Sequence, residues 1–133
     1  MTVVEDVAKQ LYIGGEWRDA VGGGTLAVED PATGEVIAEV ADATNADADA
    51  ALGAATEAFK SWKNVAPRER ADILRRAYDL IHARTDELAL LMTLEMGKPV
   101  AESRGEIAYA NNFLRWYSEE AVRINGRFTT NEA

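Results

Sequence analysis

The stretch that decides the fold runs from Thr93 to Ile107 and reads "TLEMGKPVAESRGEI". Its first half has the apolar spacing of a helix end, and Gly97 suits the left-handed conformation that closes many helices. Pro99 cannot continue that helix because it has no N–H, but its fixed φ suits the first turn of a new one. The stretch therefore predicts that one helix ends at Gly97 and that the next begins at Pro99, packed against the first.

Gly97 and Lys98 allow a second interpretation, as part of a phosphate-binding loop. Such a loop needs an earlier glycine and a Ser or Thr after the lysine, and Pro99 removes a backbone donor where donors are required. Gly22 to Gly24 lie between strand-like segments, whereas a dinucleotide fingerprint needs a helix directly after its glycines. The sequence therefore predicts no cofactor-binding residues in this chain.

The helix after Pro99 has a regular apolar pattern that should continue to Asn125-Gly126. Tyr109, Phe113 and Trp116 form a second stripe, about a quarter turn from the first at about 100° per residue. A face this wide needs covering on two sides, so we expect part of it to contact a partner or further sequence, and the isolated chain to be incompletely folded or self-associated. The first stripe comprises Ile107, Ala110, Leu114, Tyr117, Ala121 and Ile124.

Three shorter helices are predicted before Gly97. Thr44 and Asp47 fit a capping box that starts a helix ending near Trp62, and Pro67 suits the first position of the second helix. A weak break at Thr85-Asp86 starts the third. The first helix has one apolar stripe, formed by Leu52, Ala55, Phe59 and Trp62. The buried side of the second is marked by Ile73, Ala77, Leu80 and Ile81, and the third has apolar positions at Leu88, Leu91 and Met92.

Two short hairpins are predicted ahead of these helices. Gly14-Gly15 separates the apolar runs of the first hairpin, because a tight two-residue turn needs positive φ. Asp30-Pro31 opens the second turn and Gly34 closes it. The strands around it alternate with period two through Leu26 and Val28, then Val36, Ala38 and Val40.

Composition excludes several function classes. The 133 residues carry a formal charge of -9 with interleaved acids and bases, so no nucleic-acid partner is expected. The chain has no cysteine and only one histidine, His82. A metal site or a catalytic triad built on His82 would therefore lack a thiol and a second histidine.

The start, "MTVVEDVAKQ", lacks the basic flank and apolar run of a secretory signal, and no segment is apolar for long enough to span a bilayer. We expect a soluble, cytoplasmic protein with no catalytic residue of its own and no membrane partner.

The chain resembles the amino-terminal part of the NAD(P)-dependent aldehyde dehydrogenases from Leu11 to Arg127. Within that superfamily, "TLEMGKPVAESRGEIAYANNFLRWYSEEAVRI" is most similar to succinate-semialdehyde dehydrogenases. The resemblance implies an α/β fold in which small antiparallel β hairpins precede a layer of three to four helices. The segments that carry it are "YIGGEWRDA", "EDPATGEVIAEVADAT", "RERADILRRAYDLIHARTDELALLMTLEMGKPVAESRGEI" and "FLRWYSEEAVRINGR".

The resemblance also implies how the chain is organised and what reaction it serves. Residues 1–10 would be a polar lead-in, 11–127 the amino-terminal part of the cofactor-domain region, and 128–133 a truncated tail. Enzymes of this family oxidise an aldehyde by thiolate attack, hydride transfer to NAD or NADP, and hydrolysis of the thioester with a glutamate base. The cysteine, the glutamate base and the cofactor loop all lie outside this chain, so we expect an inactive fragment of a homo-oligomeric enzyme. Two alternatives stay open: a free-standing helical interaction module, and a fragment of another aldehyde dehydrogenase such as an aminoaldehyde dehydrogenase.

The family's pattern assigns roles to five residues. Tyr109 and Phe113 would line the tunnel by which the aldehyde reaches the cysteine, although aromatic stripes are also common in protein cores. Glu95, with the carbonyls of Val28 and Glu29, would hold a structural monovalent cation. Failing a cation, a Lys or Arg would contact Glu95, because a carboxylate at the negative end of a helix needs a positive neighbour unless water solvates it.

Overall fold

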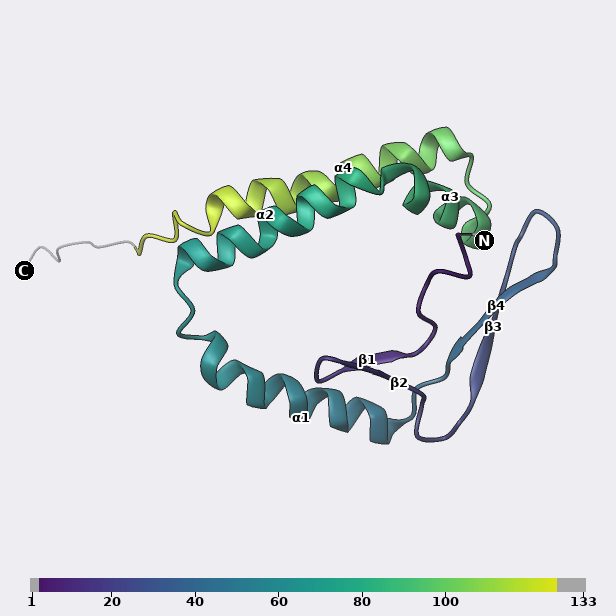
Figure 1. Cartoon of the computed structure of the whole chain (residues 1–133), viewed down its shortest axis with the longest axis horizontal. Coiled ribbons are helices and arrows are strands. Elements are labelled where there is room, and N and C mark those ends of the chain that lie inside the picture. The colour runs from purple at the N-terminus through teal and green to yellow at the C-terminus, as the bar shows by residue number, and fades with distance from the viewer. Residues whose placement is uncertain (1–2, 127–133) are drawn as a thin grey trace, which may run out of the picture.

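The computed structural model of the chain describes residues 3–126, and within them it contains two hairpins followed by four helices (Figure 1). The strands are β1 (Leu11–Ile13), β2 (Glu16–Arg18), β3 (Thr25–Glu29) and β4 (Val36–Ala41). The helices are α1 (Asn45–Trp62), α2 (Pro67–Ala83), α3 (Thr85–Met96) and α4 (Val100–Glu120). The predicted arrangement of hairpins followed by a helical layer is confirmed.

The helices are arranged in two groups. Helices α2 and α4 lie side by side, α3 packs against both at one end, and α1 lies apart from them beside the β1–β2 hairpin (Figure 1). The two hairpins are separate antiparallel sheets of two strands each, with Tyr12 opposite Trp17 in one and Leu26 opposite Val40 in the other. The α2–α4 pair, closed by α3, is therefore the most extensively packed part of the chain.

The turn between α3 and α4 follows the prediction closely. Gly97 has a φ of 74° and donates its N–H to the carbonyl of Thr93 at 2.9 Å, which closes α3. Pro99 is the N-cap of α4 rather than its first residue, because its ψ of 139° is extended and the helix begins at Val100. Gly97 also lies so close to the β3–β4 turn that an added Cβ would be 2.8 Å from Cγ of Pro31. One glycine therefore both ends α3 and lets it pack on the hairpin.

The buried side of α4 differs from the predicted stripe. Ile107, Leu114 and Ala121 are half-buried as expected, but Ala110, Tyr117 and Ile124 are exposed. The positions that complete the buried side are small or polar instead: Ser103, Asn111 and Ser118. Small side chains at these positions allow the helix axes to approach closely, and an apolar pattern alone does not reveal them.

Hydrogen bonds fix α4 against its neighbours. The hydroxyl groups of Thr93 and Ser103 lie 3.0 Å apart between α3 and α4. Asn111 donates its side-chain amide to the main-chain carbonyl of Tyr78 in α2 at 3.0 Å. These contacts determine which side of α4 faces inward and which side carries its aromatic residues outward.

The predicted end of α4 near Asn125 is wrong, since the helix ends at Glu120 with Ala121 as its C-cap. Val122 and Ile124 are β-branched, which weakens a helix, and Ile124 is 82% exposed, so no packing supports a further turn. The predicted apolar stripe of α1 is exposed within this chain at Leu52, Phe59 and Trp62. The prediction that Leu80 lies on the buried side of α2 is wrong, since Leu80 is 66% exposed.

The fully buried apolar residues among 3–126 are the small side chains Ala20, Ala71 and Ala89. Large apolar side chains on several elements are exposed at the same time, including four aromatic residues of α4. Burial of apolar surface is the main favourable term in folding. Much of the apolar surface in the described residues is therefore open to contact with other polypeptide.

Candidate functional site

The outward face of α4 carries a shallow aromatic groove. Tyr109 and Phe113 meet edge to face, with ring centroids 5.1 Å apart and an interplanar angle of 89°. Tyr109 is 64% exposed and Phe113 48% exposed, so neither belongs to the core of the described residues. The groove has a volume of about 440 Å³ and is lined by Tyr109, Asn112, Phe113, Trp116 and Tyr117.

The chemistry of this groove is that of a contact surface. Its aromatic rings can pack against a carbon chain, and the Asn112 amide can orient a polar group. No charged side chain is among the described residues that line it. Arg115 lies at a neighbouring hollow with Asn112 and Trp116, where its Nε is 3.7 Å from a carboxylate oxygen of Glu119. The groove can therefore contact an apolar chain and orient one polar group, but its lining supplies no nucleophile or general base.

The three residues predicted to hold a cation are partly brought together. Val28 and Glu95 line the same cavity, of about 80 Å³, beneath the β3–β4 hairpin and the end of α3, whereas Glu29 is not among its lining residues. Lys9 lines this cavity as well. Residues 3–126 contain no group of three or more His, Asp or Glu side chains that could hold a metal ion. The cation site stays a prediction.

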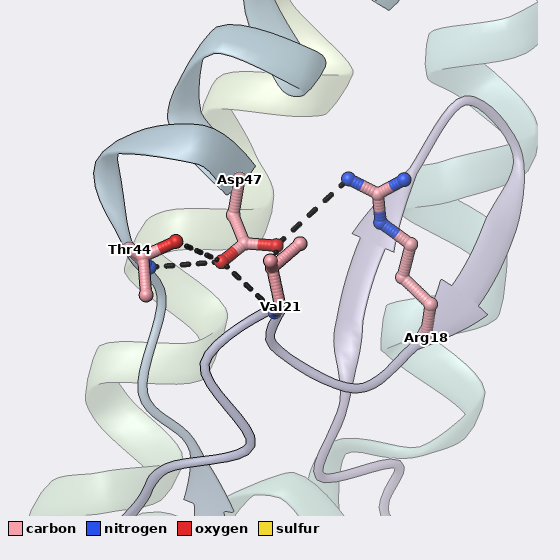
Figure 2. Close-up of polar contacts among 4 residues, drawn as sticks. All are labelled: Arg18, Val21, Thr44 and Asp47. Carbon is pink, nitrogen blue, oxygen red and sulfur yellow. Dashed lines mark hydrogen bonds and ion pairs between the residues drawn. The ribbon is translucent and has the colours of Figure 1, made fainter.

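A polar cluster that links the first hairpin to α1 was not predicted as a whole (Figure 2). Asp47 is 1% exposed, and its carboxylate accepts the N–H of Thr44 at 2.9 Å and the Thr44 hydroxyl at 2.8 Å. The same carboxylate accepts the N–H of Val21, and Nη2 of Arg18 lies 4.0 Å from it. The capping box itself is confirmed, but its contacts with Val21 and Arg18 carry no sequence signal because they are 26 and 29 residues away.

The hydrogen bonds of this cluster lower the pKa of Asp47 below its ordinary value of 3.8. The N–H of Thr44 contributes most, followed by the Thr44 hydroxyl, and the N–H of Val21 and the charge of Arg18 act in the same direction. Burial acts the opposite way, since it disfavours the charged carboxylate. Asp47 is therefore held as an anion at the positive end of α1, where it joins the helix to the preceding loop.

None of the helices in the described part of the chain is long and apolar enough to cross a membrane.

Comparison with known proteins gives relatives along most of the chain. A succinate-semialdehyde dehydrogenase of Paenarthrobacter nicotinovorans is 61% identical over 95 residues, which are 71% of this chain and 21% of that protein. A glutarate-semialdehyde dehydrogenase of Pseudomonas aeruginosa is 48% identical over 118 residues, 89% of this chain and 24% of that protein. The NADP(+) succinate-semialdehyde dehydrogenase GabD of Escherichia coli is 43% identical over 118 residues, 89% of this chain and 24% of that protein.

Solved structures share the fold. The crystal structure of a succinate-semialdehyde dehydrogenase from Burkholderia pseudomallei matches with a TM-score of 0.88 at 46% identity, over 92% of this chain and 26% of that one. PnpE in complex with nicotinamide adenine dinucleotide matches with a TM-score of 0.91 at 36% identity, over 96% of this chain and 26% of that one. The placement of α1 apart from α2 and α4 is therefore the arrangement found within longer chains.

The model of the aldehyde dehydrogenase family matches residues 17–133. The chain spans about a quarter of the length of the relatives it matches, between 21% and 26% of those described above. It belongs to the aldehyde dehydrogenase family.

Proposed function

We propose that this chain is the amino-terminal part of an NAD(P)-dependent aldehyde dehydrogenase that oxidises succinate semialdehyde, or a close analogue, to the carboxylic acid. The 61% identity to a succinate-semialdehyde dehydrogenase supports this substrate class. A betaine aldehyde dehydrogenase structure from Staphylococcus aureus shares the fold at 28% identity, which favours a semialdehyde over an aminoaldehyde. A free-standing interaction module has less support, because the fold matches a segment of much longer enzymes.

The observation that carries the proposal is the aromatic groove of α4. In the complete enzyme Tyr109 and Phe113 would form one wall of the aldehyde's passage, with the rings packed against the methylene carbons of the substrate. Their exposure fits this role, since a wall residue must be open on the side where the substrate passes. The lining of the groove has no cation for the substrate's carboxylate, so we propose that the residues recognising it come from the rest of the enzyme.

The reaction needs groups that this chain does not contain. NAD or NADP, when bound, supplies the hydride acceptor, and both occur in the names of relatives: NADP(+) for the E. coli enzyme and nicotinamide adenine dinucleotide for PnpE. The sequence has no cysteine to form the thiohemiacetal, so the 133-residue chain alone is proposed to be inactive. We propose on the family resemblance that the complete enzyme is a cytoplasmic homo-oligomer.

A second candidate substrate is glutarate semialdehyde, which is one methylene longer. The 48% identity to glutarate-semialdehyde dehydrogenase over 118 residues favours keeping it as an alternative. A hydrophobic wall discriminates only weakly between chains that differ by one methylene, by about 1–3 kcal/mol. Identity in this segment therefore supports the semialdehyde class more firmly than the length of the substrate.

A hybrid enzyme tests the proposal. The 118 residues of E. coli GabD that match this chain are replaced by the corresponding residues of this chain. Oxidation of succinate semialdehyde, glutarate semialdehyde and betaine aldehyde is then measured with NADP. We expect kcat/KM to be highest for one of the two semialdehydes. A correctly folded hybrid that binds NADP but prefers betaine aldehyde would contradict the proposed substrate class, and the unmodified E. coli enzyme is the control.

A further inference from the structure

We propose that Asn111 is a positioning residue for the aromatic groove, and that its contact with α2 tunes the affinity of the complete enzyme for its substrate. Asn111 is not among the described residues that line the groove, so it acts through Tyr109 and Phe113. The inference rests on the proposed function of the groove as a wall of the aldehyde's passage.

The first observation is the place of Asn111 on α4. It is 4% exposed and stands midway in the sequence between Tyr109 and Phe113, whose rings meet with centroids 5.1 Å apart. Residues two positions apart in a helix lie about 200° apart around its axis, at about 100° per residue. Both rings therefore lie on the side of α4 opposite Asn111, and the amide lies behind the helical turn that carries them.

The second observation is how α4 is held to α2. The side-chain amide of Asn111 donates to the main-chain carbonyl of Tyr78 at 3.0 Å. Within residues 3–126 this is the only hydrogen bond or ion pair that joins the two helices. Packing of apolar side chains is non-directional, whereas a hydrogen bond requires a narrow range of distance and angle. The amide therefore fixes the rotation of α4 at the turn that carries Tyr109 and Phe113.

The third observation is a buried atom that the fold leaves without a partner. Oδ1 of Asn111 is buried and accepts no hydrogen bond from the described residues. A buried polar atom without a hydrogen bond is unfavourable, and an apolar side chain at this position would avoid that cost. What the amide provides, and an apolar residue does not, is the directional bond to Tyr78. Its role is therefore to set geometry rather than to add stability.

Steady-state kinetics and urea unfolding of the E. coli hybrid test the inference together. Asn111→Leu keeps the branched heavy-atom skeleton but cannot donate, and it should raise KM for succinate semialdehyde by about three- to tenfold with little change in kcat. Its free energy of unfolding should stay close to that of the unmodified hybrid, because leucine removes the donor and the unpaired acceptor together. A merely structural residue would show the reverse, with lower stability and an unchanged KM.

Ser118→Ala is the matched control for these kinetics. Ser118 is buried on the same side of α4, but its hydroxyl donates to the carbonyl of Arg115 in its own helix at 2.6 Å. Its removal should therefore leave KM unchanged. If the Asn111→Leu hybrid does not fold, Asn111→Ala removes the amide without adding volume and carries the same expectation.

The kinetics separate the inference from the proposed function. If Asn111→Leu kept the KM of the unmodified hybrid while Phe113→Ala raised it, the inference would be overturned and the proposed function would stand. If Phe113→Ala also left KM unchanged, the proposed function would fail and the inference with it.

The position of α4 can be measured on the purified chain without any substrate. The chain has no cysteine, so Asp72→Cys on α2 and Ala108→Cys on α4, both exposed and outside the groove, provide two defined sites for spin labels. Labelled chains diluted in unlabelled ones report the distance within one molecule by electron–electron resonance. Asn111→Leu should broaden the distance distribution, and Ser118→Ala should leave it as in the wild type. Equal distributions for the wild type and Asn111→Leu would overturn the inference.

Discussion

The carboxylate of Asp47 accepts the main-chain N–H of Val21 at 3.1 and 3.2 Å, and so joins the first turn of α1 to the loop after β2 (Figure 2). Because α1 lies apart from the other helices, this contact is one of the few that orient it. Asp47 is buried where the loop meets the helix, although Val21 is 71% exposed, and the hydrogen bonds are stronger when the carboxylate is charged.

The pKa of Asp47 predicts acid sensitivity. The carboxyl group has a lower pKa in the folded chain than its ordinary value of 3.8, so the unfolded chain binds its proton more readily. Its stabilising contribution is therefore complete above about pH 4 to 5 and is lost as the pH falls through the folded-state pKa. We expect Asp47→Asn to lower Tm at pH 7 and this difference from the wild type to shrink towards pH 2.

Thermal melts from pH 7 to pH 2 measure this effect. Asp49→Asn is the matched control, because Asp49 lies two residues away on α1 and is exposed. Its Tm should follow the wild type across the series. A difference between the wild type and Asp47→Asn that is constant with pH would show that the charge of Asp47 contributes nothing.

Gly97→Ala should destabilise the chain for two reasons. The left-handed φ of 74° costs a residue with a side chain about 1–2 kcal/mol, and the new Cβ would be 2.8 Å from Cγ of Pro31. Gly53→Ala is the control in the opposite direction, since a Cβ there meets nothing within 4 Å and Ala is favoured in a helix by about 1 kcal/mol. Urea unfolding measures the free energy of unfolding of both variants. If Gly97→Ala left that free energy unchanged, the result would contradict the close approach of α3 to the hairpin.

The local rules that predicted Gly97 and Pro67 succeeded because they depend on neighbouring residues alone. The φ of Gly97 and the position of Pro67 at the start of α2 are as expected. The buried side of α4 was partly missed, because Ser103, Asn111 and Ser118 face inward and give no apolar signal. The Asp47–Val21 contact could not be predicted either, since its partners become neighbours only after the hairpin and helix have formed.

Tyr109 and Phe113 illustrate the same limit at the candidate site. The sequence indicated a second apolar stripe but could not tell whether it lay in the core or faced outward. In the fold, hydrogen bonds from Ser103 and Asn111 set the rotation of α4, and the aromatic stripe is left exposed. The position of the groove follows from these polar contacts rather than from the aromatic residues themselves.

The exposed aromatic face of α4 predicts that the purified chain self-associates. Each large apolar side chain left open forgoes about 1.5–3 kcal/mol of burial, so contact between copies is favoured. Trp116→Glu should raise the monomer fraction in sedimentation velocity, because it places a charge within the groove. Ala101→Glu is the control, since Ala101 is an exposed small side chain of α4 outside the groove, and its monomer fraction should match the wild type. A wild-type chain that is monomeric at all concentrations would refute this prediction.

The central claim is that α4 forms a wall of the aldehyde's passage, and steady-state kinetics of the E. coli hybrid with Phe113→Ala or Tyr109→Ala test it most directly. Loss of a contact that holds substrate and transition state alike should raise KM for succinate semialdehyde by about tenfold with little change in kcat. Leu80→Ala, an exposed position of α2 outside the groove, should leave both constants unchanged. Groove variants that retain the KM of the unmodified hybrid would contradict the claim.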